Sequence, residues 1–94
     1  MRMRGLVWLP DVVDKIRAKH GLRETEVEQV FRMDPLFRRV ERGHVPGEDL
    51  YAVLGRTDAG RYVVVFFVFK KSGDALIVTA RDMDRKERRC YENK

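Results

Sequence analysis

The sequence predicts a single α+β domain over residues 1–94, in which two N-terminal helices and a C-terminal helix pack on an antiparallel sheet. Two observations predict this class. Apolar residues recur with helical spacing in the first third of the chain, and from residue 36 the spacing changes to two, with short turns between the segments. Runs of strands joined by short turns and flanked by helices are typical of α+β folds, and a chain of 94 residues suits one core.

The first segments predict an edge strand followed by a helix. The apolar run 5–9 is short and is ended by Pro10, which fits a strand at the edge of a sheet. The segment 12–20 then has one apolar face, with Asp11 as the expected cap and Gly21 at the position that commonly ends a helix.

A second helix is predicted over residues 24–33. The spacing of Thr25 and Glu28 suggests a capping box at its start, and Asp34-Pro35 is expected to stop it.

The remaining segments predict an antiparallel meander and a final helix. The segment 62–69 is apolar at every position, so it is expected to be the central strand, covered on both faces by helices. The C-terminal segment returns to helical composition, with Asp82 or Asp84 as its cap. The other expected strands span residues 36–43, 49–56 and 75–80, joined by turns at 44–49, 56–61 and 70–74.

Composition restricts the partners. The net charge of +5 and the pI of about 9.7 favour a polyanion, with nucleic acid first. Cys90 is the only cysteine, so no intrachain disulfide can form, and with His20 and His44 it makes no recognisable metal spacing. No apolar run is long enough to span a membrane. We therefore expect a cytoplasmic protein without a metal or another cofactor.

The C-terminal segment carries a row of arginines at positions 81, 85 and 88, with Arg89 beside it. If residues 82–92 are helical, the three guanidinium groups of the row share one side and can hold phosphate oxygens. A salt-bridged, solvated helix face is the alternative, because Asp84 and Arg88 have the spacing of an intrahelical pair.

Three positions in or next to predicted strands are further candidates. Arg81 follows an apolar strand directly and should project from a rigid strand end, although pairing with a carboxylate explains it equally well. Glu48 and Arg56 have the same parity in one strand and should share a face, where Glu48 can act as general base on a ribose 2′-OH and Arg56 can stabilise the phosphate. For Glu48 and Arg56, a surface ion pair is the simpler explanation.

His20 and Tyr91 are weaker candidates. His20 lies at the end of the first predicted helix, where it either packs and caps or transfers protons. Tyr91 either donates a hydrogen bond to phosphate or completes the apolar side of the last helix.

Several short motifs together resemble the BrnT family of ribonuclease toxins, which have a RelE-like fold and belong to type II toxin–antitoxin systems. The motifs are Lys19-His20-Gly21, Val30-Phe31 with Asp34-Pro35, Gly55-Arg56 with Gly60-Arg61, and Thr79-Ala80-Arg81 with Glu87-Arg88 and Tyr91. One departure is Arg23, where the family usually has a serine or threonine cap, so the second helix is expected to start at Thr25.

The resemblance implies metal-independent cleavage of RNA by 2′-OH attack, arrest of translation, and neutralisation by a DNA-binding antitoxin that covers the basic face; whether the protein forms a homodimer stays open. Two alternatives remain: a basic RNA- or DNA-binding module without catalysis, and a partner-binding relic of a toxin. The expected catalytic residues are Arg81, Arg88, Arg56, Glu48, His20 and Tyr91, and the further RNA-binding residues are Arg61, Arg85, Arg89, Lys70 and Lys71.

Overall fold

The computed structural model describes residues 2–45 and 47–94. In order along the chain, its elements are β1 (Gly5–Val7), α1 (Pro10–His20), α2 (Glu24–Arg32), β2 (Leu36–Glu41), β3 (Leu50–Arg56), β4 (Tyr62–Phe69), β5 (Asp74–Asp82) and α3 (Arg85–Glu92). The predicted α+β class and order of elements are confirmed. The turn predicted at 44–49 contains Pro46, which lies outside the described residues.

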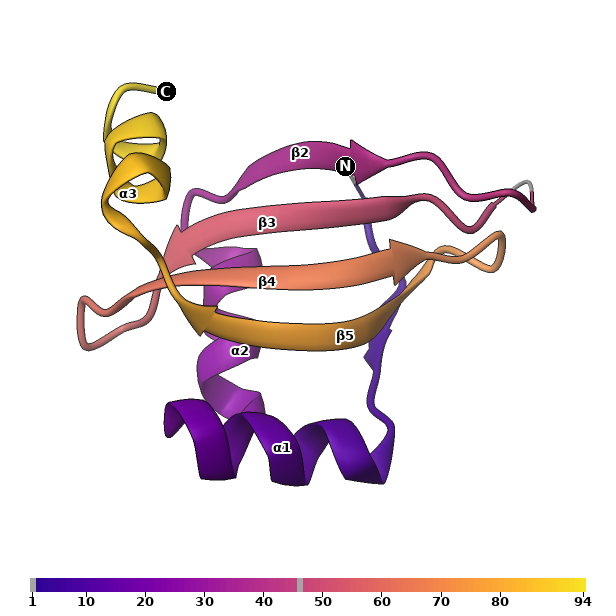
Figure 1. Cartoon of the computed structure of the whole chain (residues 1–94), viewed down its shortest axis with the longest axis horizontal. Coiled ribbons are helices and arrows are strands. Elements are labelled where there is room, and N and C mark those ends of the chain that lie inside the picture. The colour runs from indigo at the N-terminus through magenta and orange to yellow at the C-terminus, as the bar shows by residue number, and fades with distance from the viewer. Residues whose placement is uncertain (1, 46) are drawn as a thin grey trace.

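The sheet has the strand order β1-β5-β4-β3-β2, so β4 is central as predicted (Figure 1). The strands β2 to β5 form the expected antiparallel meander because short turns join each to the next. The prediction of a wholly antiparallel sheet is wrong for β1, which pairs in parallel with β5. Two helices separate β1 from the meander, so no tight turn fixes its direction.

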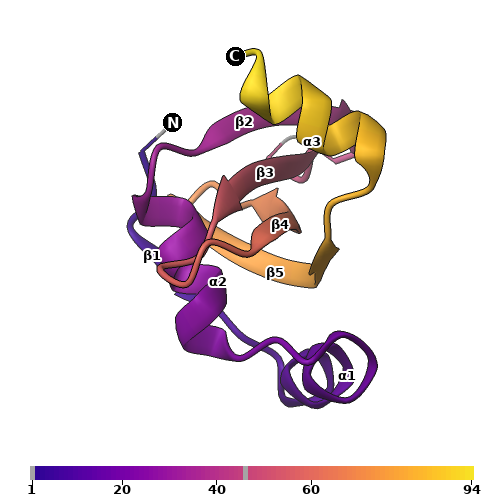
Figure 2. The ribbon, with the colours of Figure 1, turned by 90° about the vertical axis from the view of Figure 1, so that its left-hand side faces the viewer.

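The two faces of the sheet are covered differently. The helices α1 and α2 lie on one face, where Ile16, Val27 and Val30 pack on Val65 and Phe67 in the main core. The helix α3 lies on the opposite face near one end of the strands, so it covers only part of that face (Figure 2).

The helix starts differ from their predictions in detail. Leu9 rather than Asp11 precedes α1, with Pro10 in its first turn, where proline costs no hydrogen bond. The helix α2 starts at Glu24 rather than Thr25, because the Glu26 carboxylate accepts a hydrogen bond from the backbone N–H of Arg23. The predicted stops are confirmed: Gly21 ends α1 in the left-handed conformation.

The cap of α3 is Asp84, one of the two predicted. Its carboxylate accepts from the backbone N–H of Glu87 at 2.7 Å, while Glu87 accepts from the backbone N–H of Asp84 at 2.9 Å. This reciprocal pair forms a capping box and fixes the orientation of α3 where it leaves β5.

Candidate functional site

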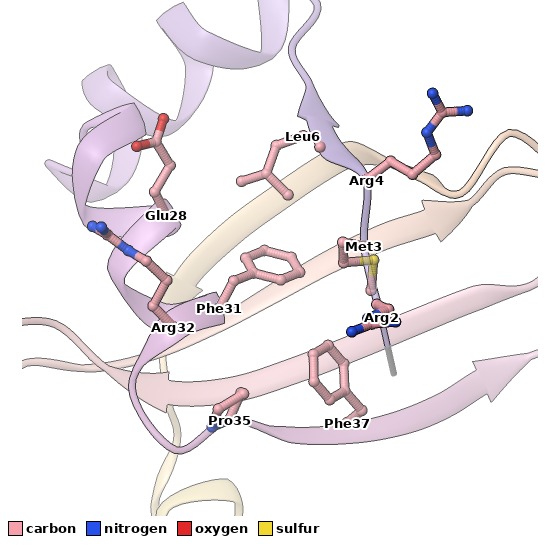
Figure 3. Close-up of a pocket in the computed structure, with 10 residues that line it drawn as sticks. Arg2, Met3, Arg4, Leu6, Glu28, Phe31, Arg32, Pro35 and Phe37 are labelled. Carbon is pink, nitrogen blue, oxygen red and sulfur yellow. The ribbon is translucent and has the colours of Figure 1, made fainter.

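The largest hollow lies on the face of the sheet that carries α1 and α2 (Figure 3). Its volume is about 540 Å³, and its floor is apolar, with Phe31 and Phe37 in ring contact at 6.1 Å between centroids. Arginines at positions 2, 4 and 32 stand around it. The residues predicted for a catalytic site do not line this hollow, so the candidate site lies elsewhere.

The opposite face gathers two of the predicted arginines around one aromatic ring. The guanidinium carbon of Arg88 lies 4.0 Å from the ring centroid of Tyr62, and that of Arg56 lies 4.7 Å from it. Arg56 is brought there because it pairs with Tyr62 across the β3–β4 hairpin, while Arg88 reaches it from α3. Both arginines are exposed and line a hollow of about 480 Å³. Arg56 donates to the backbone carbonyl of Gly60 at 3.3 Å, and Arg88 lies 3.9 Å from a carboxylate oxygen of Glu92, so their remaining N–H groups can donate to a phosphate at this point.

Arg81 faces the same side of the sheet, opposite a residue that lies two positions along β4 from Tyr62. It pairs with Val64, and its guanidinium carbon lies 5.4 Å from the ring centroid of Phe66. Two of its nitrogens donate to the carboxylate oxygens of Glu87 at 2.7 and 2.9 Å. These hydrogen bonds raise the pKa of Arg81 and lower the pKa of Glu87 from their ordinary values, so both groups are charged at neutral pH.

The expected arginine row does not form, because β5 extends to Asp82 and Arg81 therefore belongs to a strand. Arg85 and Arg89 are exposed on α3, and only Arg88 of the helical arginines reaches Tyr62. The helical periodicity assumed for residues 82–92 holds only from Arg85 onward.

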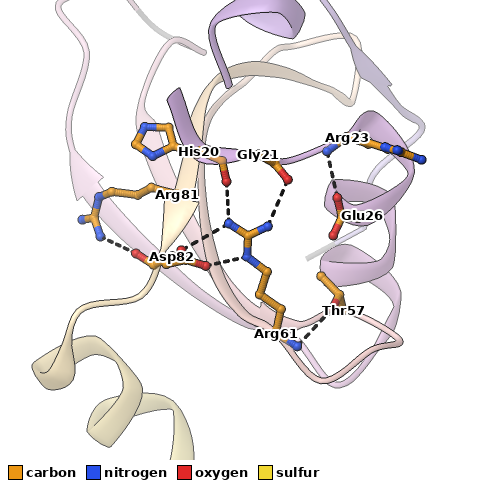
Figure 4. Close-up of polar contacts among 8 residues, drawn as sticks. All are labelled: His20, Gly21, Arg23, Glu26, Thr57, Arg61, Arg81 and Asp82. Carbon is orange, nitrogen blue, oxygen red and sulfur yellow. Dashed lines mark hydrogen bonds and ion pairs between the residues drawn. The ribbon is translucent and has the colours of Figure 1, made fainter. Parts of the chain in front are cut away.

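Arg61 holds the end of α1 to the end of β5 (Figure 4). Its guanidinium donates to the backbone carbonyls of His20 and Gly21 and forms an ion pair with Asp82 at 2.6 Å. The hydrogen bond from Arg61 lowers the pKa of Asp82. A cation at a helix C-terminus is favourable, so this arginine already has a structural role. The same contacts place His20 at the end of the sheet that carries Arg81.

Tyr91 completes the small core beneath α3, as one of its two readings predicted. It is 6% exposed, and its hydroxyl donates to the backbone carbonyl of Asp34 at 3.1 Å. Its ring meets that of Tyr62 edge-on at 6.1 Å between centroids. Tyr91 therefore supports the ring on which Arg56 and Arg88 lie.

Glu48 is not part of this constellation. It precedes β3 at the end opposite to Arg56, eight residues away, which is about 26 Å along an extended strand. There it forms an ion pair with Lys70 at 3.1 Å, next to Lys71. Glu48 and Arg56 have the same parity along the chain, but eight residues of nearly extended chain separate them.

Sequence reasoning missed four residues that the structure adds to this face: Arg38, Tyr62, Phe66 and Glu87. Two of them had a usable signal: Glu87 stands three residues after Asp84, a spacing that indicates a capping box, and Tyr62 directly follows the predicted hairpin turn 56–61, opposite Arg56. The positions of Arg38 and Phe66 depend on which strand lies next to which.

Two negative observations apply to the part of the chain that the structure describes. No helix there is long and apolar enough to cross a membrane. In the same residues, no group of three or more histidine, cysteine, aspartate or glutamate side chains could hold a metal ion.

Comparison with known proteins gives consistent results. The family model described as the ribonuclease toxin BrnT of type II toxin–antitoxin systems matches residues 8–87. A crystal structure of the Brucella abortus ribonuclease toxin BrnT resembles this chain with a TM-score of 0.62 and 16% sequence identity, over 86% of this chain and 97% of that chain. At that identity the likeness supports the fold alone. No curated protein matches. Because the family model covers most of its length, this chain belongs to the BrnT family of ribonuclease toxins of type II toxin–antitoxin systems.

Proposed function

We propose that the protein is a metal-independent endoribonuclease that acts in the cytoplasm and arrests translation by cutting RNA on the α3 face of the sheet. The observation that carries this proposal is the convergence of Arg56 and Arg88 on the ring of Tyr62, beside the ion pair of Arg81 and Glu87. Guanidinium groups bind phosphate oxygens through paired hydrogen bonds and keep their charge at any physiological pH. They can therefore supply the positive charge that a metal ion supplies in other nucleases.

In the proposed reaction the ribose 2′-oxygen attacks the neighbouring phosphorus atom in line with the 5′-oxygen of the next nucleotide. The bond between the 2′-oxygen and phosphorus forms while the bond between phosphorus and the 5′-oxygen breaks, which leaves a 2′,3′-cyclic phosphate and a 5′-hydroxyl. A base takes the proton of the 2′-hydroxyl, and an acid protonates the leaving oxygen. Arg56, Arg81 and Arg88 would stabilise the extra negative charge on the phosphate, an effect worth several kcal/mol in comparable sites.

Of the two residues considered for proton transfer, we favour His20 over Glu48, although α1, which carries His20, packs on the face opposite to α3. His20 lies at the end of the sheet that carries Arg81, through the contacts of Arg61 with its carbonyl and with Asp82. Glu48 lies at the other end, paired with Lys70. The Glu87 carboxylate is a weak base because its pKa is lowered, so its proposed role is to position Arg81.

We also propose a DNA-binding antitoxin that covers this basic face. Family membership implies an antitoxin partner, and the net charge of +5 favours a partner segment rich in acidic residues. The elution volume of the free protein in size-exclusion chromatography would show whether it is a monomer or a homodimer.

The test is incubation of the purified protein with a 5′-labelled RNA in EDTA, alongside Arg81→Ala and Arg17→Ala. Arg17 is an exposed arginine on α1, so its removal changes the net charge equally and leaves the α3 face untouched. We expect cleavage by the native protein and by Arg17→Ala, with a loss of at least about a hundredfold in Arg81→Ala.

If the native protein leaves free RNA uncut, the same three proteins are tested on RNA that is being translated by ribosomes. A toxin that arrests translation can require the ribosome to present its substrate. If RNA stays intact there as well, the catalytic proposal is wrong and the non-catalytic RNA-binding reading replaces it.

A further inference from the structure

A second hollow on the α3 face has features of a binding site for a nucleobase. It is a groove of about 320 Å³ between β2 and α3, with a floor of Ala52, Leu54, Val64 and Phe66. Arg38, Ala52 and Phe66 are neighbours in one row across three strands. The groove exists because alanine is the small residue in this row, between a long arginine and a large aromatic ring.

The floor and the walls of the groove supply different interactions. The aromatic ring of Phe66 forms part of the floor, with the guanidinium carbon of Arg81 5.4 Å from its centroid. Single-stranded RNA is recognised largely by bases that stack on aromatic rings and on arginine guanidinium planes. Arg38 stands at the β2 wall, and Glu87 stands at the α3 wall. Arg38 is close enough to Glu87 to help lower the pKa of that carboxylate. A donor group on the β2 wall and an acceptor group on the α3 wall therefore stand above an apolar floor.

Both polar groups have hydrogen-bonding capacity left. Arg38 donates to the Cys90 sulfur at 3.5 Å, which is a weak acceptor, and a guanidinium has five N–H groups. The Glu87 carboxylate accepts from two nitrogens of Arg81 and from the backbone N–H of Asp84. A carboxylate has about four lone-pair sites, so one on Oε2 remains for a ligand.

We propose that this groove is a subsite for guanine and gives the nuclease a preference for RNA with guanosine next to the cut. Guanine is the base that presents two acceptors, O6 and N7, on one edge and two donors, N1–H and N2–H, on the adjacent edge. Arg38 would donate to O6 and N7, and Oε2 of Glu87 would receive N1–H and N2–H as a three-centre contact. The ring would lie on Phe66.

The other bases fit the two polar groups less well. Adenine and cytosine place a ring nitrogen acceptor toward the carboxylate, where two lone pairs repel each other. Uracil offers one N–H to the carboxylate, but it has no purine N7 for the second nitrogen of Arg38. The expected order of affinity is therefore guanine, then uracil, then adenine and cytosine, with about tenfold between the first and the last.

The inference rests on the proposed function for its biological role, but its binding test does not need cleavage. The probe is a set of five-nucleotide adenosine RNAs with guanosine, inosine, 7-deazaguanosine, uridine, cytidine or adenosine at the centre. All are 2′-O-methylated so that no 2′-hydroxyl can attack. Fluorescence anisotropy with native protein, Arg38→Ala, Glu87→Gln and Arg17→Ala gives each dissociation constant.

We expect the guanosine probe to bind about tenfold more tightly than the adenosine probe, with inosine between them because it lacks the N2 amino group. Replacing guanosine by 7-deazaguanosine should weaken binding to native protein and to Arg17→Ala, but not to Arg38→Ala, which has no donor for N7. Arg38 is exposed, so its removal should not unfold the protein. In Glu87→Gln the difference between guanosine and inosine should disappear.

The proposed subsite is wrong if native protein binds all the probes with equal affinity. It is also wrong if replacing guanosine by 7-deazaguanosine weakens binding to Arg38→Ala as much as it weakens binding to native protein. Failure of the guanine subsite and failure of the proposed nuclease function would give different results. A protein that prefers guanosine but does not cut RNA would support the subsite and refute catalysis, whereas one that cuts at all bases equally would refute the subsite alone.

Discussion

Glu87 links three parts of the molecule through one carboxylate. It closes the capping box of α3, binds Arg81 of β5 through both oxygens, and forms one wall of the groove. Its side chain is 22% exposed, so solvent screens the ion pair only in part. The position of Arg81 on the α3 face therefore depends on Glu87.

The lowered pKa of Glu87 predicts how stability depends on pH. Because its pKa in the folded protein lies below the ordinary glutamate range, the carboxylate stabilises the fold above that range. The contribution is lost as the pH falls through the ordinary range and then through the folded-state pKa. Glu87→Gln should therefore lower the free energy of unfolding by about 1 kcal/mol at pH 7, and this difference should become smaller as the pH falls below the ordinary glutamate range.

Urea unfolding of both proteins at pH 7, 5 and 3 would measure this difference. At each pH, the free energy of unfolding of Glu87→Gln is subtracted from that of the native protein. Both proteins contain Asp82, whose pKa is also lowered, so its contribution cancels. Glu41→Gln, at an exposed position at the end of β2, is the matched control and should change stability little. A gap between native protein and Glu87→Gln that is the same at all three pH values would show that the ion pair is not its source.

Gly55 is required for packing rather than for a turn. It lies within β3, and a Cβ atom built on it would come within 2.9 Å of the backbone oxygen of Val30 and 3.0 Å of Cγ1 of the same residue. The close approach of α2 to the sheet is therefore possible only with glycine here. We predict that Gly55→Ala lowers the free energy of unfolding by about 1–3 kcal/mol, because a backbone atom must move.

The measurement is the urea midpoint of Gly55→Ala, with Ala59→Gly in the β3–β4 turn as a second small change nearby. Ala59 is exposed, so its substitution should cost less than 1 kcal/mol. Equal stability of Gly55→Ala and native protein would mean that α2 can shift away from the sheet at no cost.

At the scale of elements, α3 depends on its cap. The helix has eight residues, which is too short to be stable alone in water, and its N-terminal N–H groups depend on Asp84. Asp84→Ala should lower the free energy of unfolding by about 1 kcal/mol, whereas Asp84→Asn should retain most of the stability because asparagine is also a good cap.

Loss of the cap in Asp84→Ala should also make α3 more mobile, including its residues Glu87 and Arg88. Amide hydrogen exchange would report this as faster exchange in residues 85–92 with little change in β4. Uniformly faster exchange across the sheet would show instead that α3 and the sheet unfold as one unit.

Local and distant contacts differ in how well the sequence predicts them. The meander β2 to β5 was predictable because each strand is joined to the next by a short turn, and such turns leave only an antiparallel pairing. The direction of β1 was not predictable, because its pairing with Asp74–Leu76 is separated from it by most of the chain. Helix starts were off by one or two residues, since neither Leu9 nor Arg23, which stand at the observed N-cap positions, is a residue type that usually caps a helix.

In the candidate site, too, contacts between neighbouring segments were predictable from the sequence and contacts between distant segments were not. Arg56 meets Tyr62 across a hairpin that the sequence already indicated, so this pair could have been named in advance. Arg88 reaches the same ring only because α3 folds back over the sheet, and the spacing of residues in a helix carries no information about that. Glu48 was wrongly grouped with Arg56, although counting eight residues of extended strand would have separated them.

At the scale of the whole molecule, predicted RNA-contacting cations lie at both ends of the sheet. Arg56 and Arg88 meet at one end, and Lys70 and Lys71 follow β4 at the other, about 26 Å away along eight residues of extended chain. A three-nucleotide RNA, which has two internucleotide phosphates, is too short to span this distance, so bound at the arginines it would reach that end only. The dependence of affinity on salt can distinguish the two ends, because each neutralised phosphate of a single strand adds about −0.7 to the slope of log K against log salt concentration.

We predict that Arg56→Ala with Arg88→Ala lowers the magnitude of this slope by about 1.4, the value for two phosphate contacts, when an uncleavable three-nucleotide RNA is titrated at several salt concentrations. Lys70→Ala with Lys71→Ala removes the same net charge and should leave the slope unchanged, because Lys70 is paired with Glu48 and both lie beyond the reach of this RNA. A 15-nucleotide RNA can span the strands, so with it the lysine variant should also lose slope if RNA runs along the sheet. Equal losses from both double variants with the short RNA would contradict the placement, since they would mean that only overall charge attracts the RNA.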